Sequence, residues 1–130
     1  MLDKRNFYIN GKWVSPSKKN DFEVINPSNE EPFATISLGH KEDTDAAVNA
    51  AKNAFIKWKE TSKEERINLL EKLLKIYKKR FNAMTEAITM EMGSPIDYSS
   101  STHTVSGQSH LEDFISVSYT HLTLPTKRIV

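Results

Sequence analysis

Residues 41–58 read KEDTDAAVNAAKNAFIKW, and at this stretch the sequence changes from a strand-like to a helix-like pattern. Acidic residues occupy the first turns, where the helix dipole favours negative charge. The apolar residues recur every three or four positions, which places them on one face of an α-helix: Ala47, Val48, Ala51, Phe55 and Trp58. We therefore expect an amphipathic helix over residues 41–59.

Upstream of this helix, short aromatic and β-branched runs indicate strands. Residues 7–14 read FYINGKWV, with Asn10 and Gly11 between two such runs. A tight hairpin turn needs positive φ at both central residues, and Asn-Gly is the pair that tolerates it best. Two further runs are separated by a turn that begins at Asn26-Pro27: FEVI (22–25) and FATISL (33–38). The sequence therefore predicts a small layer of antiparallel strands before the helix.

Downstream, the helical period continues. Ser62 and Glu65 have the spacing of a capping box, and an apolar stripe follows them: Ile67, Leu70, Leu73, Leu74, Tyr77 and Phe81. A third segment, 82–92, ends at Gly93. Pro95 opens a fourth helix that ends near LEDFI (111–115), weakly encoded because YSSSTHTVSGQS is rich in residues that favour caps and turns. The fold class is α/β, with strands followed by three to four helices.

Composition excludes several classes of protein. Eighteen basic residues stand against 17 acidic ones, so no net field attracts nucleic acid or an anionic membrane. The chain has no cysteine, which removes disulfides, thiolate metal sites and a cysteine nucleophile together. No apolar run is long enough to cross a bilayer. We expect a cytoplasmic protein with no nucleic-acid or membrane partner.

Local chemistry alone indicates no active site. KLLKIYKKR (72–80) is most simply a solvated face opposite the apolar stripe. His103 and His110 lie two helical turns apart and have no third ligand nearby. Two non-catalytic readings remain open: a stand-alone helical interaction module that binds through Leu70, Leu74 and Tyr77, and a nucleic-acid-binding basic helix.

The order of several short motifs is more informative. In chain order they are YINGKW, INP, DAAVNAAKNAF, SKEERINLLEKL and EMGSP. Together they resemble the N-terminal part of the aldehyde dehydrogenase superfamily, from about Phe7 to Ile115. EMGSP has Ser94 where the family most often has lysine, and His40 stands where a Ser or Thr cap is usual. The resemblance implies that residues 1–115 are an incomplete piece of the family's cofactor-binding domain.

The resemblance implies NAD(P)-dependent oxidation of an aldehyde to a carboxylic acid. In the family a thiolate attacks the carbonyl, hydride leaves to the nicotinamide, and a Glu-activated water hydrolyses the thioester. Those groups and the cofactor-binding strands follow the present segment in family members. We therefore expect NAD or NADP, a small-molecule aldehyde and a homo-oligomer for the full-length parent, and neither activity nor cofactor binding for this chain.

The resemblance also implies one ion site. Many family members bind a monovalent cation through main-chain oxygens just before the Asn-Pro turn and a carboxylate two residues before the E-x-G-x-P glycine. The matching positions are Val24, Ile25 and Glu91.

Residues 116–130, SVSYTHLTLPTKRIV, break the pattern. They hold Lys127 and Arg128 and no acid, whereas all 17 acidic residues lie in residues 1–115. This tail matches no family segment and resembles translated adapter or vector sequence joined to a truncated reading frame, so we expect it to be disordered and to pack on nothing. The alternative is a genuine C-terminal strand through Val117, Tyr119, Leu122 and Leu124.

Overall fold

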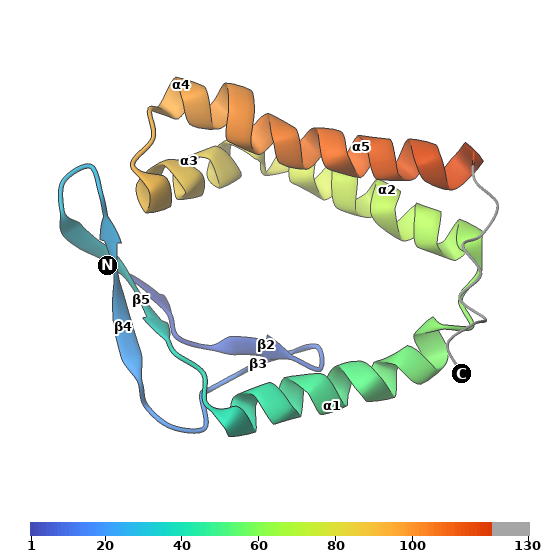
Figure 1. Cartoon of the computed structure of the whole chain (residues 1–130), viewed down its shortest axis with the longest axis horizontal. Coiled ribbons are helices and arrows are strands. Elements are labelled where there is room, and N and C mark those ends of the chain that lie inside the picture. The colour runs from blue at the N-terminus through green and yellow to red at the C-terminus, as the bar shows by residue number, and fades with distance from the viewer. Residues whose placement is uncertain (121–130) are drawn as a thin grey trace. The chain divides into compact units, whose positions relative to one another are not determined.

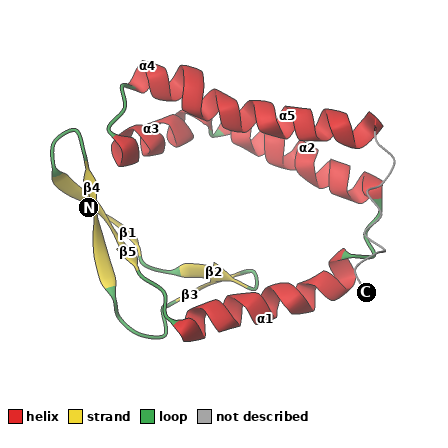
Figure 2. Ribbon diagram, in the orientation of Figure 1, coloured by secondary structure: helices red, strands yellow, loops and turns green. Residues whose placement is uncertain are grey.

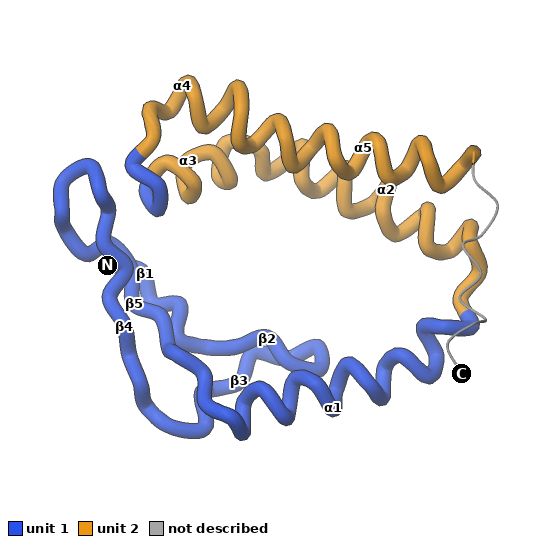
Figure 3. The backbone as a smooth tube through the Cα atoms, viewed as in Figure 1, with its two compact units in different colours: residues 1–60, 90–93 blue, residues 61–89, 94–130 orange. Residues whose placement is uncertain are grey.

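The computed structural model of the chain describes residues 1–120. These residues form two compact units (Figure 3). The first unit comprises residues 1–60 together with 90–93, and the second comprises residues 61–89 together with the residues from 94 onward. Within residues 1–120, no helix combines the length and apolar character needed to cross a membrane.

Short strands precede the helices along the chain (Figure 2), which confirms the expected α/β class. The strands are β1 (Leu2–Lys4), β2 (Phe7–Ile9), β3 (Lys12–Val14), β4 (Asp21–Asn26) and β5 (Glu31–Ser37). The helices are α1 (Lys41–Trp58), α2 (Lys63–Lys79), α3 (Phe81–Met92), α4 (Ile96–Tyr98), the π-helical segment η1 (Ser99–Thr104) and α5 (Val105–Thr120).

The hairpin predicted from Asn10-Gly11 is confirmed. Strands β2 and β3 pair in antiparallel register with Tyr8 opposite Trp13. Asn10 has φ of 51° and Gly11 has φ of 76°, the left-handed conformation that such a turn requires. The Tyr8 and Trp13 rings meet edge to face with their centroids 5.2 Å apart, which is a favourable aromatic arrangement.

A second, three-stranded sheet has the order β1-β5-β4. Strands β4 and β5 pair in antiparallel register, as predicted, whereas β1 pairs in parallel with β5 and was not predicted. The layer is therefore mixed rather than antiparallel throughout. Strand β1 is only three residues long and reads LDK, so it carries no alternating apolar pattern. Ala34 and Ser37 of β5 are the buried residues of this sheet.

Helix α1 begins as predicted but does not bury its apolar face. Asp43 accepts hydrogen bonds from the N–H of His40 at 2.9 Å and from the N–H of Ser17 at 2.8 Å, so one carboxylate joins the helix start to the loop after the hairpin. None of the helix residues is buried, and Val48 and Phe55 are 59% and 58% exposed. The apolar face of α1 therefore stays exposed within the first unit.

In the second unit, α2 packs against α5 (Figure 1). The predicted capping box is present: Ser62 Oγ accepts from the N–H of Glu65 at 3.1 Å, and Glu65 Oε2 accepts from the N–H of Ser62 at 2.7 Å. Ile67 on the apolar stripe is 5% exposed. The stripe is therefore partly covered, by α5 within its own unit.

A buried polar cluster lies where η1 meets its neighbours. Thr104 and Ser99 are fully buried. Tyr77 donates its hydroxyl hydrogen to the carbonyl of Thr104 at 3.0 Å, and the Thr104 and Thr85 hydroxyl oxygens are 2.9 Å apart. These bonds satisfy polar groups that would otherwise be costly to bury. They join α2, α3 and η1 through hydrogen bonds.

The fourth predicted helix is longer than expected, because α5 continues through Ile115 to Thr120. Tyr119 donates its hydroxyl hydrogen to Glu71 Oε1 at 2.6 Å. The expectation that the tail packs on nothing is therefore wrong for residues 116–120. Val117 and Tyr119 are helical, so the strand alternative fails for them as well. The remaining part of the tail, residues 121–130, lies outside the described residues.

Candidate functional site

The candidate ion site begins at the turn that ends β4. The carbonyl oxygen of Asn26 accepts from the N–H of Glu30 at 2.8 Å, and its side-chain Oδ1 accepts from the N–H of Ser28 at 3.0 Å. Such a side-chain bond two residues on is the usual way in which Asn stabilises a turn. The Asn-Pro turn is therefore a defined local structure within its own segment.

Gly93 lies against this turn although 65 residues separate it from Ser28. Its φ is +67°, and a Cβ at this position would lie 3.1 Å from Pro27 Cβ and 3.2 Å from Ser28 Oγ. Both the backbone conformation and the available space therefore require glycine. Ser28 Oγ also donates to the carbonyl oxygen of Gly93, at 3.4 Å. The glycine of E-x-G-x-P and the Asn-Pro turn thus meet within one unit.

The three predicted ion ligands lie on the two segments that meet here. Val24 and Ile25 belong to β4; Val24 is half-buried and Ile25 is 44% exposed. Glu91 is an exposed residue of α3, two positions before Gly93. The contact between Gly93 and the turn brings their segments together, and within residues 1–120 the Glu91 carboxylate has no hydrogen-bond or ion-pair partner.

The backbone at this point is suited to offering carbonyl oxygens. The register of the β4–β5 pair shifts between Val24 and Ile25, and the residue opposite Ile25 is Pro32. Proline has no N–H, so the ladder lacks a donor there. Hard monovalent and divalent cations favour oxygen ligands, including main-chain carbonyls. Within residues 1–120 no three His, Asp or Glu side chains converge on a metal position.

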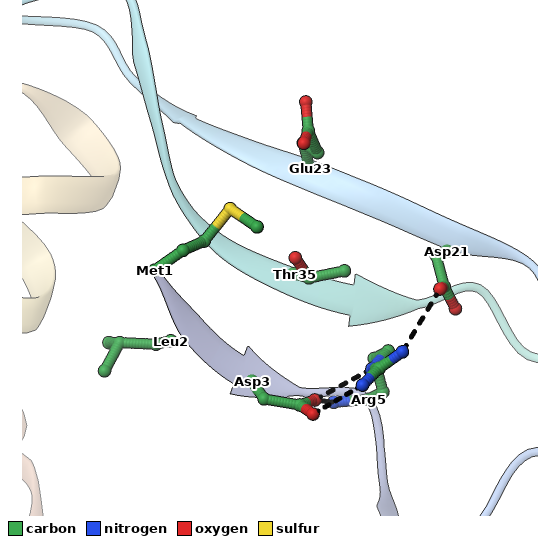
Figure 4. Close-up of a pocket in the computed structure, with 7 residues that line it drawn as sticks. All are labelled: Met1, Leu2, Asp3, Arg5, Asp21, Glu23 and Thr35. Carbon is green, nitrogen blue, oxygen red and sulfur yellow. Dashed lines mark hydrogen bonds and ion pairs between the residues drawn. The ribbon is translucent and has the colours of Figure 1, made fainter.

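A second polar region, the Arg5 cluster, lies beside β1. Figure 4 shows Arg5 between Asp3 and Asp21. These three residues help to line a pocket of about 370 Å³. Arg5 donates to both carboxylate oxygens of Asp3, at 2.9 and 2.6 Å, and to Asp21 Oδ2 at 3.4 Å. These hydrogen bonds hold the pKa of Asp3 at about 2. Because two carboxylates already engage Arg5, it is poorly placed to bind an anionic ligand.

The serines near the EMGSP motif lack the partners of a nucleophile. Ser99 is fully buried, and its hydroxyl oxygen lies 2.6 Å from that of Ser94 rather than near a basic group. Ser94, which stands where the family most often has lysine, therefore has a local hydrogen-bonding role. His103 packs edge to face on Tyr98, with ring centroids 5.1 Å apart. An activated hydroxyl needs an adjacent base, and within residues 1–120 the Ser99 hydroxyl has no hydrogen bond to one.

Comparison with known proteins supplies the wider context. The model of the aldehyde dehydrogenase family matches residues 13–123. The match extends beyond Ile115, so the expectation that the tail matches no family segment is wrong for residues 116–123. A 3-succinoylsemialdehyde-pyridine dehydrogenase of a Pseudomonas species is 45% identical over 96 residues, which cover 74% of this chain and 20% of that protein. The chain thus spans about a fifth of the length of the curated relatives it matches.

Solved structures of aldehyde dehydrogenases also resemble this chain. An aldehyde dehydrogenase from Bartonella henselae matches 98% of this chain and 28% of its own chain, with a TM-score of 0.92 and 47% identity. Aldehyde dehydrogenase C of Pseudomonas syringae, solved with NAD+ and octanal, matches 91% of this chain and 24% of its own, with a TM-score of 0.88 and 30% identity. From the family match over most of its length and from these structures, the chain belongs to the aldehyde dehydrogenase family.

Proposed function

We propose that the full-length parent of this chain oxidises an aldehyde to a carboxylic acid with NAD or NADP. The observation that carries the proposal is the family match over residues 13–123. Solved neighbours are named as complexes with NAD+, and one of them also with octanal, which favours NAD and a small aldehyde for the parent. By the same analogy we propose a homo-oligomeric parent.

The chain itself supplies structure to that reaction rather than chemistry. Its 130 residues contain no cysteine to form the thiolate that the family's reaction needs. We propose that the isolated chain neither binds NAD(P) nor oxidises an aldehyde. What its residues do in the parent is to fold the Asn-Pro turn onto Gly93 and so hold two segments of the cofactor-binding domain together.

We further propose that Val24, Ile25 and Glu91 hold a monovalent cation. The missing ladder donor at Pro32 and the register shift beside Ile25 support the use of backbone oxygens. The contact of Gly93 with Pro27 and Ser28 supports the approach of the Glu91 segment to them. A cation bound in this way would stabilise the join between β4 and the end of α3.

A covalent chimera tests the proposed function. In it, residues 1–115 of this chain replace the segment that they match in the Bartonella henselae enzyme. We expect the chimera to reduce NAD+ or NADP+ in the presence of an aldehyde, because the exchanged segment is 47% identical and has the same fold. A folded chimera without activity, beside an active parent enzyme, would contradict the family-level function of this segment.

The cation proposal has its own measurement in the same chimera. Replacing tetramethylammonium chloride with potassium chloride should raise the thermal midpoint, and Glu91→Gln should reduce this gain. Glu86→Gln is the matched control, because Glu86 is also an exposed carboxylate on α3. Equal gains in all three proteins would exclude Glu91 as a ligand.

We also propose a foreign origin for residues 124–130, which follow the family match and hold Lys127 and Arg128 but no acidic residue. The test is the DNA of the parent gene. We expect intact genomic DNA to continue from the family-like part into a frame that encodes a cysteine and a glutamate. Recovery of the ending SVSYTHLTLPTKRIV from that DNA would contradict the proposal.

A further inference from the structure

The turn between β2 and β3 contains a reactive pair of residues, Asn10 and Gly11. The side-chain amide of an asparagine can be attacked by the backbone nitrogen of the next residue. The attack is fastest when that residue is glycine, because glycine has no side chain to shield its nitrogen. Of the nine asparagines in the chain, only Asn10 precedes a glycine. Asn10 is therefore the asparagine whose neighbour is best suited to attack it.

The reacting atoms of this pair are free of other contacts. The register of the hairpin pairs Ile9 with Lys12, so the loop consists of Asn10 and Gly11 alone. Both loop residues are exposed. Within residues 1–120, neither the Asn10 amide nor the Gly11 N–H takes part in a hydrogen bond. A Cβ added at Gly11 would meet no atom within 4 Å outside its chain neighbours, so there is also room for a ring to close here.

The paired hairpin controls when these atoms meet. Asn10 and Gly11 both have positive φ, at 51° and 76°, as a two-residue turn requires. Ring closure needs a rotation about the Asn10 Cα–C bond that brings Cβ and the Gly11 nitrogen to the same side. The paired turn holds this bond in one conformation. The reaction therefore proceeds when the hairpin opens.

The hairpin is held together weakly at its turn end. Strands β2 and β3 form a two-stranded sheet of their own, with three residues in each strand. A two-stranded hairpin by itself is at best marginally stable in water. The rings that meet across it, Tyr8 and Trp13, are 63% and 70% exposed. Phe7, which lies close to Gly39, is at the end away from the turn. We therefore expect frequent opening at Asn10 and Gly11.

We propose that Asn10-Gly11 is a site of spontaneous modification, where opening of the β2–β3 hairpin lets Asn10 convert to aspartate and isoaspartate. Hydroxide removes the proton of the Gly11 N–H, and the nitrogen forms a bond to Asn10 Cγ. The Cγ–Nδ2 bond breaks, and ammonia leaves a five-membered succinimide. Water then adds to either of the two ring carbonyls and breaks its bond to the Gly11 nitrogen. One water is consumed for each ammonia released, and nothing is oxidised or reduced.

The two products affect the hairpin differently. Cleavage at Cγ gives aspartate, which adds a charge but keeps the turn, because Asp-Gly favours the same turn type as Asn-Gly. Cleavage at the backbone carbonyl gives isoaspartate, whose side chain now carries the main chain and lengthens the loop by one methylene group. The two-residue turn that sets Tyr8 opposite Trp13 is then lost. Isoaspartate thus keeps the hairpin open.

The first measurement is peptide mapping by mass spectrometry of the purified 130-residue chain during storage at pH 8. Isoaspartate is detected with an isoaspartyl methyltransferase and labelled S-adenosylmethionine. We expect Asn10 to convert first, at a rate proportional to the hydroxide concentration. Asn53 is the internal control, because it is also exposed but precedes alanine, and it should stay unconverted over the same time.

A second measurement tests the role of hairpin opening. Trp13→Ala should speed conversion of Asn10 by roughly two- to tenfold, the factor by which loss of one aromatic pair favours the open hairpin. Trp58→Ala is the matched control, because Trp58 lies on α1 and not on the hairpin. The NMR signal of the Trp13 indole should change in the isoaspartyl chain but not in freshly purified Asn10→Asp, which carries the same charge on an unaltered backbone.

Three results would overturn the proposal, and none of them depends on enzymatic activity. In the first, Asn10 converts no faster than Asn53. In the second, Trp13→Ala leaves the rate of conversion unchanged, which would show that hairpin opening does not control the reaction. In the third, the isoaspartyl chain keeps the Trp13 signal of Asn10→Asp, which would show that the modification leaves the hairpin paired.

Discussion

Gly93 combines a left-handed backbone with a close contact, and the two effects can be separated. Gly11 has a similar φ, +76° against +67°, but an added Cβ there meets no atom within 4 Å. In the chimera, Gly11→Ala should lower the free energy of unfolding by about 1 kcal/mol, the strain of a left-handed residue. Gly93→Ala should cost more, because the new methyl group also presses on Pro27 and Ser28.

The measurement is urea unfolding of both variants, with Gly11→Ala as the control for strain alone. Equal losses would mean that the turn moves aside freely. In that case the contact between Gly93 and the Asn-Pro turn does not hold the candidate ion site together.

Asp43 makes the start of α1 sensitive to acid. The hydrogen bonds from the N–H groups of His40 and Ser17 lower the pKa of Asp43. Because the folded carboxyl has the lower pKa, its stabilisation is present above the unfolded value of about 4 and declines as the pH falls through the folded value. We predict that the amide protons of His40 and Ser17 lose their protection from exchange below about pH 4.

Amide exchange followed by NMR from neutral to acidic pH checks this prediction. Asp43→Asn should remove the pH dependence at these two amides, whereas Asp113→Asn, a matched change of an exposed carboxylate, should not. Protection that stays unchanged from pH 6 down to the pH at which the Asp43 carboxyl is protonated would show that the Asp43 charge is not what holds the helix start.

At the scale of elements, α2 and α5 approach closely because residue 107 is glycine. A Cβ at Gly107 would lie 3.1 Å from Tyr77 Cζ and still closer to the Tyr77 hydroxyl. Gly107→Ala should therefore destabilise the chimera by roughly 1–3 kcal/mol, as overpacking does. Tyr77→Phe should lower stability by about 1 kcal/mol, because it removes the hydrogen bond to the Thr104 carbonyl.

The double variant is the sharper measurement. Once the Tyr77 hydroxyl is gone, the new methyl group at residue 107 meets less obstruction. The double variant should therefore lose less stability than the sum of the losses in the two single variants. Strict additivity in urea unfolding would show that the hydroxyl and residue 107 do not compete for the same space.

The sequence predicts well those elements that are stabilised by interactions between residues close together in the chain. The hairpin follows from Asn10-Gly11, and the start of α2 follows from the Ser62–Glu65 capping box. Strand β1 could not be predicted, because its stabilisation comes from pairing with β5, some thirty residues away in sequence. The uninterrupted run from α4 through η1 to α5 depends on tertiary hydrogen bonds such as Tyr77 to Thr104, which have no signature in a Ser- and Thr-rich segment.

In the candidate site too, features set by nearby residues could be predicted, whereas contacts between distant segments could not. Gly93 is identifiable as a helix-ending glycine, and its φ of +67° agrees with that prediction. Its contact with Pro27 and Ser28 joins two segments 65 residues apart, and only the family resemblance placed them in one site. The resemblance also named Val24, Ile25 and Glu91 as ligands, and that assignment stays a prediction.

At the scale of the whole molecule, the described part of the chain has little apolar core. Within residues 1–120, Ala34 and Ile67 are the buried apolar residues, at 4% and 5% exposed. Fully burying a large apolar side chain stabilises by roughly 1.5–3 kcal/mol, and a small domain has a total stability of about 5–15 kcal/mol. We therefore predict that the isolated chain keeps far-UV helicity but binds ANS and has a weak near-UV signal from Trp13 and Trp58.

The covalent chimera is the control for that prediction, because there the same residues are part of a complete enzyme, and ANS binding should fall. An isolated chain that binds no ANS and melts in one sharp transition would contradict it. Such a result would favour a self-sufficient helical module.

The central claim is that the chain belongs to the aldehyde dehydrogenase family without carrying the family's chemistry. Its most direct test is NAD(P)H formation by the purified 130-residue chain, supplied with NAD+ or NADP+ and acetaldehyde, benzaldehyde or octanal, beside a heat-killed sample. The account predicts no difference between the two, because the chain has no cysteine and, within residues 1–120, the hydroxyl of Ser99 pairs with Ser94 rather than with a base. Aldehyde-dependent NAD(P)H formation above the heat-killed sample would contradict it.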